Sequence, residues 1–384
     1  MRVAYVSTYP PIHCGVGEYT RLLSTALNSA SPNVEIIVLA EEGVRSEYVD
    51  PANSARVKPS FRARDPASYR GILDGLAELG GVDIIHVQHE YGIYGYNSRI
   101  LEVVEEAVGE RLARAGVVTL HTVNRLPYGH PESIDFQRQA VERADAIIVH
   151  SMVQEYELYS QTGGYSRRIT RIPHGTMVNP YISTPRLHLA RTLGLEPGIL
   201  GRLIIVLPGF LRPDKGVDIL YEALGMLDRE ARGRMHVIVA GEPRDERLAS
   251  LAEEGGFTLI PRYLSTDEIL MLSALADAIV LPYRDPPGKY AVSGILHLSM
   301  GSLKPVLGAA TPRLSELYML APRLVFKAGD PAGLALRLRS LLDQALYEVL
   351  VSYAGPLYSY AVRTGWQRMA RRHLNLYAKL LEGH

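Results

Sequence analysis

The sequence predicts an α/β protein with two doubly wound domains, each built on a parallel β-sheet. Three observations lead to this prediction. The 384 residues are too many for one typical hydrophobic core, so two domains are expected. Short apolar runs, typical of buried parallel strands, alternate with segments of helical periodicity, and this alternation predicts βαβ units. The same scheme occurs in both halves of the chain.

The first half is expected to begin with a buried strand at residues 2–7, which Pro10 and Pro11 end. The segment Gly15-Val16-Gly17 follows and leads into a helical pattern at 21–27, so the predicted order is strand, glycine loop, helix. Further strands of the first half are expected at residues 35–40, 82–87, 117–120 and 146–149, and helices at 98–115 and 134–143.

The second half repeats the scheme after a predicted linker at residues 179–201, where Pro180, Pro185 and Pro197 interrupt the pattern. Its strands are expected at 203–207, 235–240, 258–260, 278–282, 305–307 and 323–326. We predict domains of residues 1–185 and 186–355, followed by a C-terminal segment of residues 356–384. That segment carries a helical stripe formed by Trp366, Met369, His373, Leu376, Tyr377 and Leu380.

The composition is that of an ordinary globular protein. Its 41 Lys and Arg residues balance 41 Asp and Glu residues, and 47% of the chain is hydrophobic, which excludes a disordered chain and an electrostatic nucleic-acid binder. The single cysteine, Cys14, excludes a disulfide framework and a cysteine zinc site. No signal-type segment or bilayer-spanning apolar run is present. We expect a cytoplasmic protein, with peripheral membrane association on the cytoplasmic face left open.

The strongest functional signal lies between the strand at 203–207 and the helical pattern that begins at Val217. Gly209 to Gly216 places Arg212 and Lys215 beside the expected helix N-terminus. Unpaired N–H groups and the helix dipole favour an anion there, Arg grips phosphate in bidentate fashion, and Lys supplies a point charge. A strand-to-helix turn with solvated charges is the alternative. In a parallel sheet ligands bind beyond the carboxyl ends of the strands, and further candidates follow other predicted strands.

Glycine at positions 15 and 17 lets backbone amides approach a phosphate or sugar closely. The segment lacks the full dinucleotide fingerprint because position 20 is Thr. His121 directly follows the strand at 117–120 and is expected at the ligand-binding edge, a structural histidine being the alternative.

Gln88 to Gly92 follows another apolar run. His89, Glu90 and Tyr91 in this segment suit hydroxyl recognition or acid–base chemistry, or they cap the next helix. His174-Gly175 follows a strand-like segment near the predicted linker, where a tight turn is the alternative.

These motifs, together with Leu281-Pro282-Tyr283, Ser293-Gly294 and Lys304-Pro305, resemble the retaining glycosyltransferases of family 4. The resemblance covers nearly the whole chain. It implies the GT-B fold, with two Rossmann-like domains facing each other across a cleft and a C-terminal helix that crosses back to the first. The segments at residues 7–11, 88–92 and 120–122 resemble a subgroup associated with mannose-containing glycans. Mannose from GDP-mannose is therefore the favoured donor, with a glucose-type donor as the alternative.

The resemblance also implies roles for individual residues. Arg212 and Lys215 would bind the donor diphosphate, Gly15, Val16 and Gly17 would pack on it or on the sugar, and Ser293 and Gly294 would offer backbone amides. His121 would contact the sugar as a catalytic residue, with Glu90 and His89 on the acceptor side. The expected nucleoside contacts are Gly209, Arg262, Tyr263, Leu264 and Glu316, and the other expected cleft residues are His174, Gly175 and Tyr290.

One departure from the family pattern concerns two glutamates, eight residues apart, that usually grip the sugar and the ribose. Tyr290 and Leu298 stand in their places, and neither can act as a carboxylate. This departure affects the expected ribose contact and donor selectivity.

The missing D-x-D motif predicts a metal-independent reaction with the nucleotide sugar as co-substrate and no other cofactor. The resemblance implies transfer of a hexose to a glycan, lipid or small-molecule acceptor, with the leaving phosphate taking the acceptor proton. Two alternatives are a glycoside phosphorylase on the same fold and a catalytically silent sugar-nucleotide-binding protein. A dehydrogenase is disfavoured because it needs the dinucleotide fingerprint.

Overall fold

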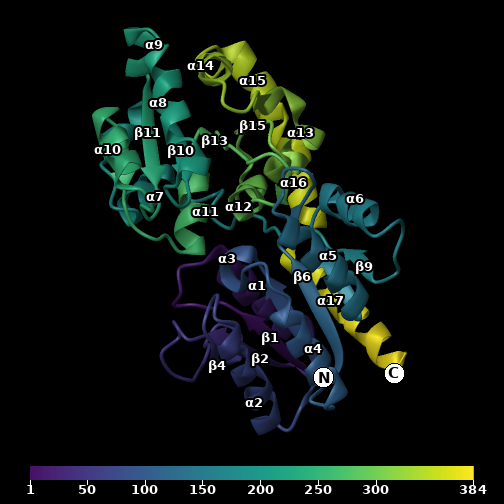
Figure 1. Cartoon of the computed structure of the whole chain (residues 1–384). Helices are drawn as coiled ribbons and strands as arrows, with labels where there is room; N and C mark the ends of the chain where they lie inside the picture. Colours follow the sequence, from purple (N-terminus) through teal and green to yellow (C-terminus); the bar gives the residue numbers. More distant parts are fainter. Residues whose placement is uncertain (384) are drawn as a thin grey trace. The chain divides into compact units, whose positions relative to one another are not determined.

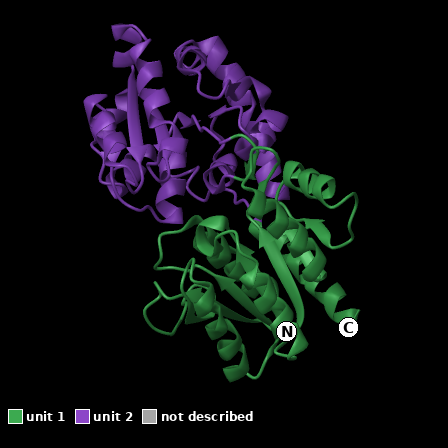
Figure 2. Ribbon diagram, viewed as in Figure 1, with its two compact units in different colours: residues 1–175, 287–292, 366–384 green, residues 176–286, 293–365 purple. Residues whose placement is uncertain are grey.

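The computed structural model describes residues 1–383, which form two compact units (Figures 1 and 2). The first unit comprises Met1–Gly175, Pro287–Val292 and the segment from Trp366 onward, and the second comprises Thr176–Pro286 and Ser293–Gly365. These limits differ from the predicted domain boundaries after residues 185 and 355, and the domain assignment stays a prediction. His384, the last residue of the predicted C-terminal segment, lies outside the described residues.

The first unit contains an eight-stranded sheet in the order β3-β4-β2-β1-β5-β6-β8-β9. All neighbouring strands are parallel except β3 and β4. The strands of this unit are β1 (Arg2–Ser7), β2 (Glu35–Glu41), β3 (Tyr48–Val49), β4 (Arg56–Phe61), β5 (Val82–His89), β6 (Ala113–Leu120), β7 (Thr122–Asn124), β8 (Ala146–Val149), β9 (Ile169–Arg171) and β14 (Lys289–Ala291). Its helices are α1 (Gly15–Ala30), α2 (Arg70–Glu78), α3 (Tyr91–Tyr94), α4 (Arg99–Gly109), α5 (Pro131–Arg143), α6 (Met152–Gln161) and α17 (Trp366–Glu382). The five strands expected in the first half are confirmed.

Two local predictions in the first unit are wrong. The helix expected at residues 98–115 ends at Gly109, because Arg111 adopts a left-handed backbone with φ of 60° and β6 begins at Ala113. The expected glycine loop is the first turn of α1, and the loop itself lies between β1 and Gly15.

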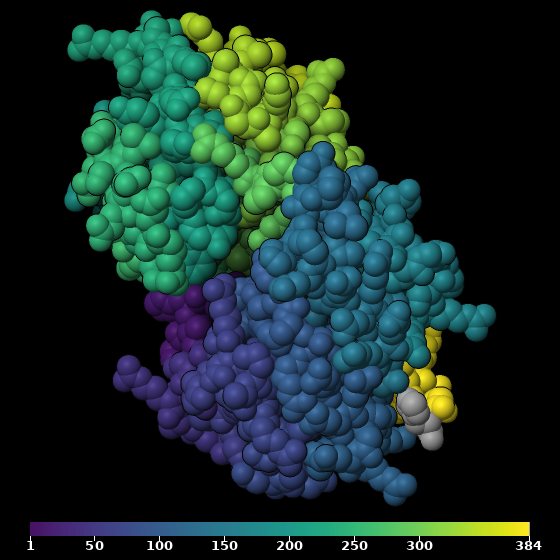
Figure 3. Space-filling view, in the orientation of Figure 1, coloured from purple at the N-terminus to yellow at the C-terminus, as the bar shows by residue number. Residues whose placement is uncertain are grey.

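The C-terminal helix α17 packs within the first unit, against α1 and β6. Its buried residues Trp366, Met369, His373 and Tyr377 belong to the apolar stripe seen in the sequence. The space-filling view shows α17 in yellow only near its C-terminal end (Figure 3). The helix thus contributes side chains to the interior of the first unit.

The second unit contains a six-stranded parallel sheet in the order β12-β11-β10-β13-β15-β16. Its strands are β10 (Leu203–Pro208), β11 (Met235–Ala240), β12 (Thr258–Ile260), β13 (Ala278–Leu281), β15 (Val306–Ala309) and β16 (Val325–Phe326). Its helices are α7 (Arg186–Thr192), α8 (Val217–Gly225), α9 (Arg229–Gly233), α10 (Glu246–Glu254), α11 (Thr266–Leu275), α12 (Gly294–Ser299), α13 (Ser315–Leu320), α14 (Pro331–Ser340), α15 (Gln344–Ser352) and α16 (Ala354–Arg363). Strands occur at all six places expected in the second half, but the one expected at 323–326 is limited to β16, because Pro322–Leu324 form a 3-10 turn.

The predicted linker at residues 179–201 is folded structure. It contains α7, whose Leu189 and Ala190 are buried in the core of the second unit. The prolines that suggested a linker lie at the ends of short elements: Pro185 is the N-cap of α7, and Pro197 opens a 3-10 turn. No helix among residues 1–383 is both long and apolar enough to span a membrane.

Candidate functional site

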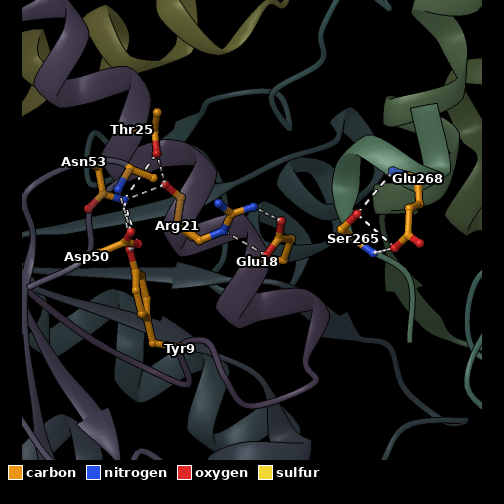
Figure 4. A network of polar contacts seen from close by, with 9 residues as sticks. Tyr9, Glu18, Arg21, Thr25, Asp50, Asn53, Ser265 and Glu268 are labelled. Carbon is orange, nitrogen blue, oxygen red and sulfur yellow. Dashed lines mark hydrogen bonds and ion pairs between the residues drawn. The ribbon is translucent and has the colours of Figure 1, made fainter. Parts of the chain in front are cut away.

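The segment between β1 and α1 is held by a buried polar network (Figure 4). The Tyr9 hydroxyl donates to Asp50 at 2.7 Å, and the Asn53 amide donates to the Tyr9 hydroxyl at 2.9 Å and to Thr25 at 3.2 Å. Hydrogen bonds between buried groups restrict motion more than exposed ones do. The network therefore fixes the backbone that leads into the Gly15–Gly17 turn.

The predicted Gly15, Val16 and Gly17 form the first turn of α1, a 16-residue helix. Gly17 is buried, and a Cβ there would lie 3.2 Å from backbone atoms of Thr8 and Tyr9, so a larger residue would be crowded. Gly15 is exposed and faces open space. The unpaired amides of this turn are suited to an anion or a sugar hydroxyl.

His121 lies in an aromatic cluster of the first unit that surrounds the Tyr19 ring. Four other rings have their centres within 5.2 Å of the centre of that ring: His121 at 4.8 Å, His150 at 5.0 Å, His174 at 5.1 Å and Trp366 at 5.2 Å. The structure thus brings together His121 and His174, which the sequence indicated. The sequence did not indicate Tyr19, His150 or Trp366 as members of a site.

Gln154 fixes the backbone at His121. Its side-chain amide donates to the carbonyl oxygen of His121 at 3.0 Å and to that of Tyr290 at 3.2 Å. Tyr290 lies on β14, which pairs with β7 directly after His121, and its hydroxyl accepts a hydrogen bond from Arg125. Burial, together with nearby histidines, lowers the pKa of His121 well below its usual value, so its imidazole is neutral at pH 7.

The structure does not support His89 as an acceptor-side residue. It is 0% exposed, and its ring stacks on Phe136 with centres 4.1 Å apart and on Tyr94 at 5.5 Å. Within residues 1–383 neither ring nitrogen has a hydrogen-bond partner, and burial lowers the pKa of His89 to about 3. His89 is a neutral core residue. Glu90, by contrast, is half-buried and accepts a hydrogen bond from the Thr122 hydroxyl at 2.7 Å.

Gly175 owes its place to packing against Trp366. A Cβ at this position would lie 2.2 Å from the indole ring, so only glycine allows the tryptophan to reach the cluster. Gly175 is thus a packing residue, and no side chain is available there for ligand contact.

In the second unit, Lys215 has an unusual environment. It is 7% exposed, and its ammonium lies 3.9 Å from the centre of the Tyr283 ring. Among residues 1–383 it makes no ion pair. Burial lowers its pKa well below 10.5, and the nearby charge of Arg313 adds to that effect, whereas the charges of Asp214 and Asp285 oppose it. A buried cation that makes no direct ion pair is costly, so this position suits an incoming anion.

Two guanidinium groups flank Lys215. Arg212 pairs with Asp214 through its Nε at 3.0 Å and is about half exposed. Arg313 is nearly buried and binds Asp214 at 2.6 Å and also Asp285. Sequence reasoning did not assign Arg313 to the site. Burial opposes the charge of Asp214, but the hydrogen bond from Arg313 and the neighbouring cations lower the pKa of its carboxyl overall.

Glycines shape the backbone around these cations. Gly216 has φ of 71°, and a Cβ there would lie 2.0 Å from the carbonyl oxygen of Pro282, so the turn requires glycine. Gly209 has φ of 108° and lies against Ile295. Ser293 caps α12 by accepting from the amide of Leu296, and its hydroxyl lies 3.4 Å from that of Tyr283. Gly294 is exposed at the start of α12.

The remaining predicted nucleoside contacts are spread over other loops of the second unit. Arg262 pairs with Glu268 at 2.5 Å, Leu264 is buried, and the Tyr263 ring lies 5.7 Å from Phe210. Glu316 is buried in the first turn of α13, where it accepts from the Ser315 hydroxyl at 3.1 Å.

No group of three or more His, Cys, Asp or Glu side chains in the described part of the chain could hold a metal ion. Metal independence itself stays a prediction.

Two family models match the chain. One describes Glycosyltransferase Family 4 and matches residues 14–178, and the other describes glycosyl transferases group 1 and matches residues 202–344. A D-inositol 3-phosphate glycosyltransferase of Thermobispora bispora is 24% identical over 331 residues, which cover 80% of this chain and 73% of that protein.

Solved structures show the same fold. The crystal structure of Anabaena Alr3699/HepE in complex with UDP-glucose has a TM-score of 0.71 at 16% identity, and the match covers 100% of both chains. Sucrose-phosphate synthase from Thermosynechococcus elongatus has a TM-score of 0.74 at 16% identity, again over 100% of both chains. With the two family models spanning most of its length, the chain belongs to the GT-B glycosyltransferases, and its first half is of the family 4 type.

Proposed function

We propose that the chain is a retaining hexosyltransferase that uses a nucleoside diphosphate sugar and needs no metal ion. The observation that carries the proposal is the buried Lys215 ammonium, which makes no ion pair with a described acid and lies on Tyr283. Arg212 and Arg313 add two guanidinium groups to the same part of the second unit. A diphosphate would supply the anionic oxygens that Lys215 lacks, and it would also accept hydrogen bonds from the two guanidinium groups.

The reaction develops negative charge on the departing phosphate as the bond from the anomeric carbon to the phosphate oxygen breaks. Arg212 and Lys215 would stabilise that charge electrostatically. The acceptor hydroxyl oxygen forms the new bond on the same face of the sugar, and its proton passes to the departing phosphate. This scheme retains the anomeric configuration and requires no protein nucleophile.

We assign His121 to the transferred sugar. Its neutral imidazole is held between Tyr19 and His150, and its backbone carbonyl is fixed by Gln154. A neutral ring with a fixed position can recognise sugar hydroxyls without adding charge. Glu90 stays an acceptor-side candidate, whereas the buried His89 has no role in the proposed reaction.

The sugar and base of the donor have two candidates. Motifs of the first half favour GDP-mannose, whereas complexes of HepE with UDP and with UDP-glucose favour a UDP-glucose type. A thermal-shift screen over GDP-mannose, UDP-glucose, UDP-GlcNAc and ADP-glucose decides between them, because a ligand that binds only the native state raises the unfolding temperature. If none of the four donors stabilises the chain, the proposed function is wrong.

Transfer should be tested with three acceptors: a glycan, a lipid-linked sugar, and D-inositol 3-phosphate, after which the Thermobispora relative is named. Because Tyr290 and Leu298 replace the usual glutamates, a catalytically silent binder is the second candidate. A silent binder would be stabilised by a donor without consuming it. A phosphorylase would release the sugar as its phosphate ester when inorganic phosphate is the co-substrate.

We place the activity in the cytoplasm, at the membrane face where the acceptor is lipid-linked.

A further inference from the structure

We propose that Gln88 is a positioning residue that sets the hydrogen position on His121, and that Tyr377 of the C-terminal helix controls Gln88 through His86. The proposal rests on the proposed role of His121 at the transferred sugar. All four residues belong to the first unit and are buried.

The contact between Gln88 and His121 defines the tautomer of the imidazole. The amide oxygen of Gln88 lies 2.9 Å from Nε2 of His121. An amide oxygen can only accept a hydrogen bond, so Nε2 of His121 must carry the hydrogen. Because burial lowers the pKa of His121, the ring is neutral and its Nδ1 carries a lone pair.

His86 fixes the orientation of the Gln88 amide. Nε2 of His86 lies 3.3 Å from the amide nitrogen of Gln88 and 2.8 Å from the Thr119 hydroxyl. It accepts from both, because amide nitrogen can only donate. His86 therefore carries its hydrogen on Nδ1, and burial lowers its pKa as well. With its nitrogen held at His86, the Gln88 amide keeps its oxygen toward His121.

The chain of hydrogen bonds ends at the C-terminal helix. Nδ1 of His86 donates to the Tyr377 hydroxyl at 2.7 Å, and that hydroxyl lies 2.9 Å from the hydroxyl of Tyr5. Tyr377 thus has a polar contact on the buried face of α17. Removing its hydroxyl frees His86 to move its hydrogen to Nε2, which forces the Gln88 amide to turn over. The turned amide would then donate to His121, and the hydrogen on His121 would move to Nδ1.

Other groups around His121 fix the ring but not its tautomer. Tyr19 of α1 and His150, which follows β8, pack on the ring, and Gln154 of α6 binds the backbone carbonyl. The Gln154 bond reaches the backbone carbonyl of His121 and not a ring nitrogen. Gln88 therefore determines which of the two neutral tautomers the His121 ring adopts.

The first experiment is a kinetic double-mutant cycle with Gln88→Met and His121→Ala, using UDP-glucose and GDP-mannose as donors. Methionine keeps the length of glutamine and removes its amide. We expect kcat of the Gln88→Met protein to fall by up to roughly a hundredfold, the scale for a misplaced group, with KM for the donor nearly unchanged. In the His121→Ala background the same change should cost nothing further. Losses that multiply would overturn the proposal.

Gln137→Met is the matched control. Gln137 is also fully buried in the first unit, but it binds Asn124, Tyr91 and Gln161. Whatever loss this change causes should multiply with that of His121→Ala. If it too disappears in the His121→Ala background, the cycle reports general loosening of the fold and the positioning role is refuted.

The second experiment needs no activity. Nitrogen-15 spectra of the histidine rings distinguish the two neutral tautomers, and the His121 signals are identified by their loss in His121→Ala. We expect the Nε2–H form in the wild type, a mixture in Gln88→Met, and an added Nδ1–H population in Tyr377→Phe. An Nδ1–H ring in the wild type, or an unchanged ring in both variants, refutes the proposal. If neither donor turns over while the tautomers behave as expected, the proposed function fails and the positioning stands.

Discussion

Replacing Lys215 with Met separates ligand binding from folding. Met has a similar length and an apolar stem, so it can keep the packing on Tyr283 and remove the charge. Lys215 is 7% exposed, and its ammonium makes no ion pair with any acid among residues 1–383, so its burial opposes folding. We therefore expect the ligand-free Lys215→Met protein to unfold at the same temperature as the wild type or a higher one.

The same change should weaken nucleoside diphosphate binding. Loss of one charge-assisted hydrogen bond costs about 1.5 to 3 kcal/mol, and about 1.4 kcal/mol corresponds to a factor of ten in Kd. Calorimetry with UDP and GDP should show affinity lower by about one to two orders of magnitude. Lys304→Met is the control, because Lys304 is a partly buried lysine of the same unit whose pKa is also lowered by burial. Wild-type affinity in Lys215→Met, or a large fall in its ligand-free stability, would refute this reasoning.

The pH dependence of stability and of diphosphate affinity gives an independent test of the role assigned to Lys215. Its native pKa is lowered, so between that value and the ordinary pKa of about 10.4 the unfolded chain holds more protons than the native one. Stability should rise with pH across this window, whereas diphosphate affinity should fall because a neutral amine attracts phosphate less. Both slopes should be smaller in Lys215→Met, measured by urea unfolding and by calorimetry.

Three further outcomes are expected. Transfer should persist in excess EDTA, and an activity that returns only with Mg²⁺ or Mn²⁺ would show that an ion stabilises the leaving group. Gly216→Ala should lower the free energy of unfolding by more than about 1 kcal/mol, because its φ is 71° and its Cβ would meet Pro282. The control is Gly225→Ala, where a Cβ meets nothing within 4 Å; in urea titrations this change should be neutral or stabilising. His121→Ala should lower turnover far more than UDP or GDP affinity, whereas Arg212→Ala should lower that affinity by calorimetry; equal effects on both quantities in the two variants would contradict the assigned roles.

The fold was predictable because nearly all of the long strands are compact apolar runs. The strands that were not expected are mostly two or three residues long, such as β7 and β14, and are too short for a periodic pattern. Strand β4 is longer but carries polar residues and a proline in its sequence RVKPSF. Their pairing depends on partners far along the chain, so no local signal indicates them.

The candidate site was predictable only where its members are close in sequence. Arg212 and Lys215 lie in one turn, whereas Arg313, Tyr283 and Asp285 come from loops after other strands and meet Lys215 through the sheet topology. Alternation along strands could have corrected the assignment of His89. Neighbouring residues of a strand point to opposite faces, so His89 lies opposite Gln88 and enters the core beside Phe136.

In the second unit, the charges around Lys215 sum to a net positive charge, and the usual paired glutamates are replaced. Leu298 has no carboxylate, and its side chain is 7% exposed and belongs to the hydrophobic core. The acids nearest the cations are Asp214 and Asp285, and both are engaged by Arg313. Three cations against two acids leave one positive charge, and the ion pairs hold Arg313 in place before any ligand arrives. Because a preorganised cation loses little freedom on binding, we expect this arrangement to hold a diphosphate firmly, whereas it supplies no substitute for the ribose contact of a carboxylate at position 298.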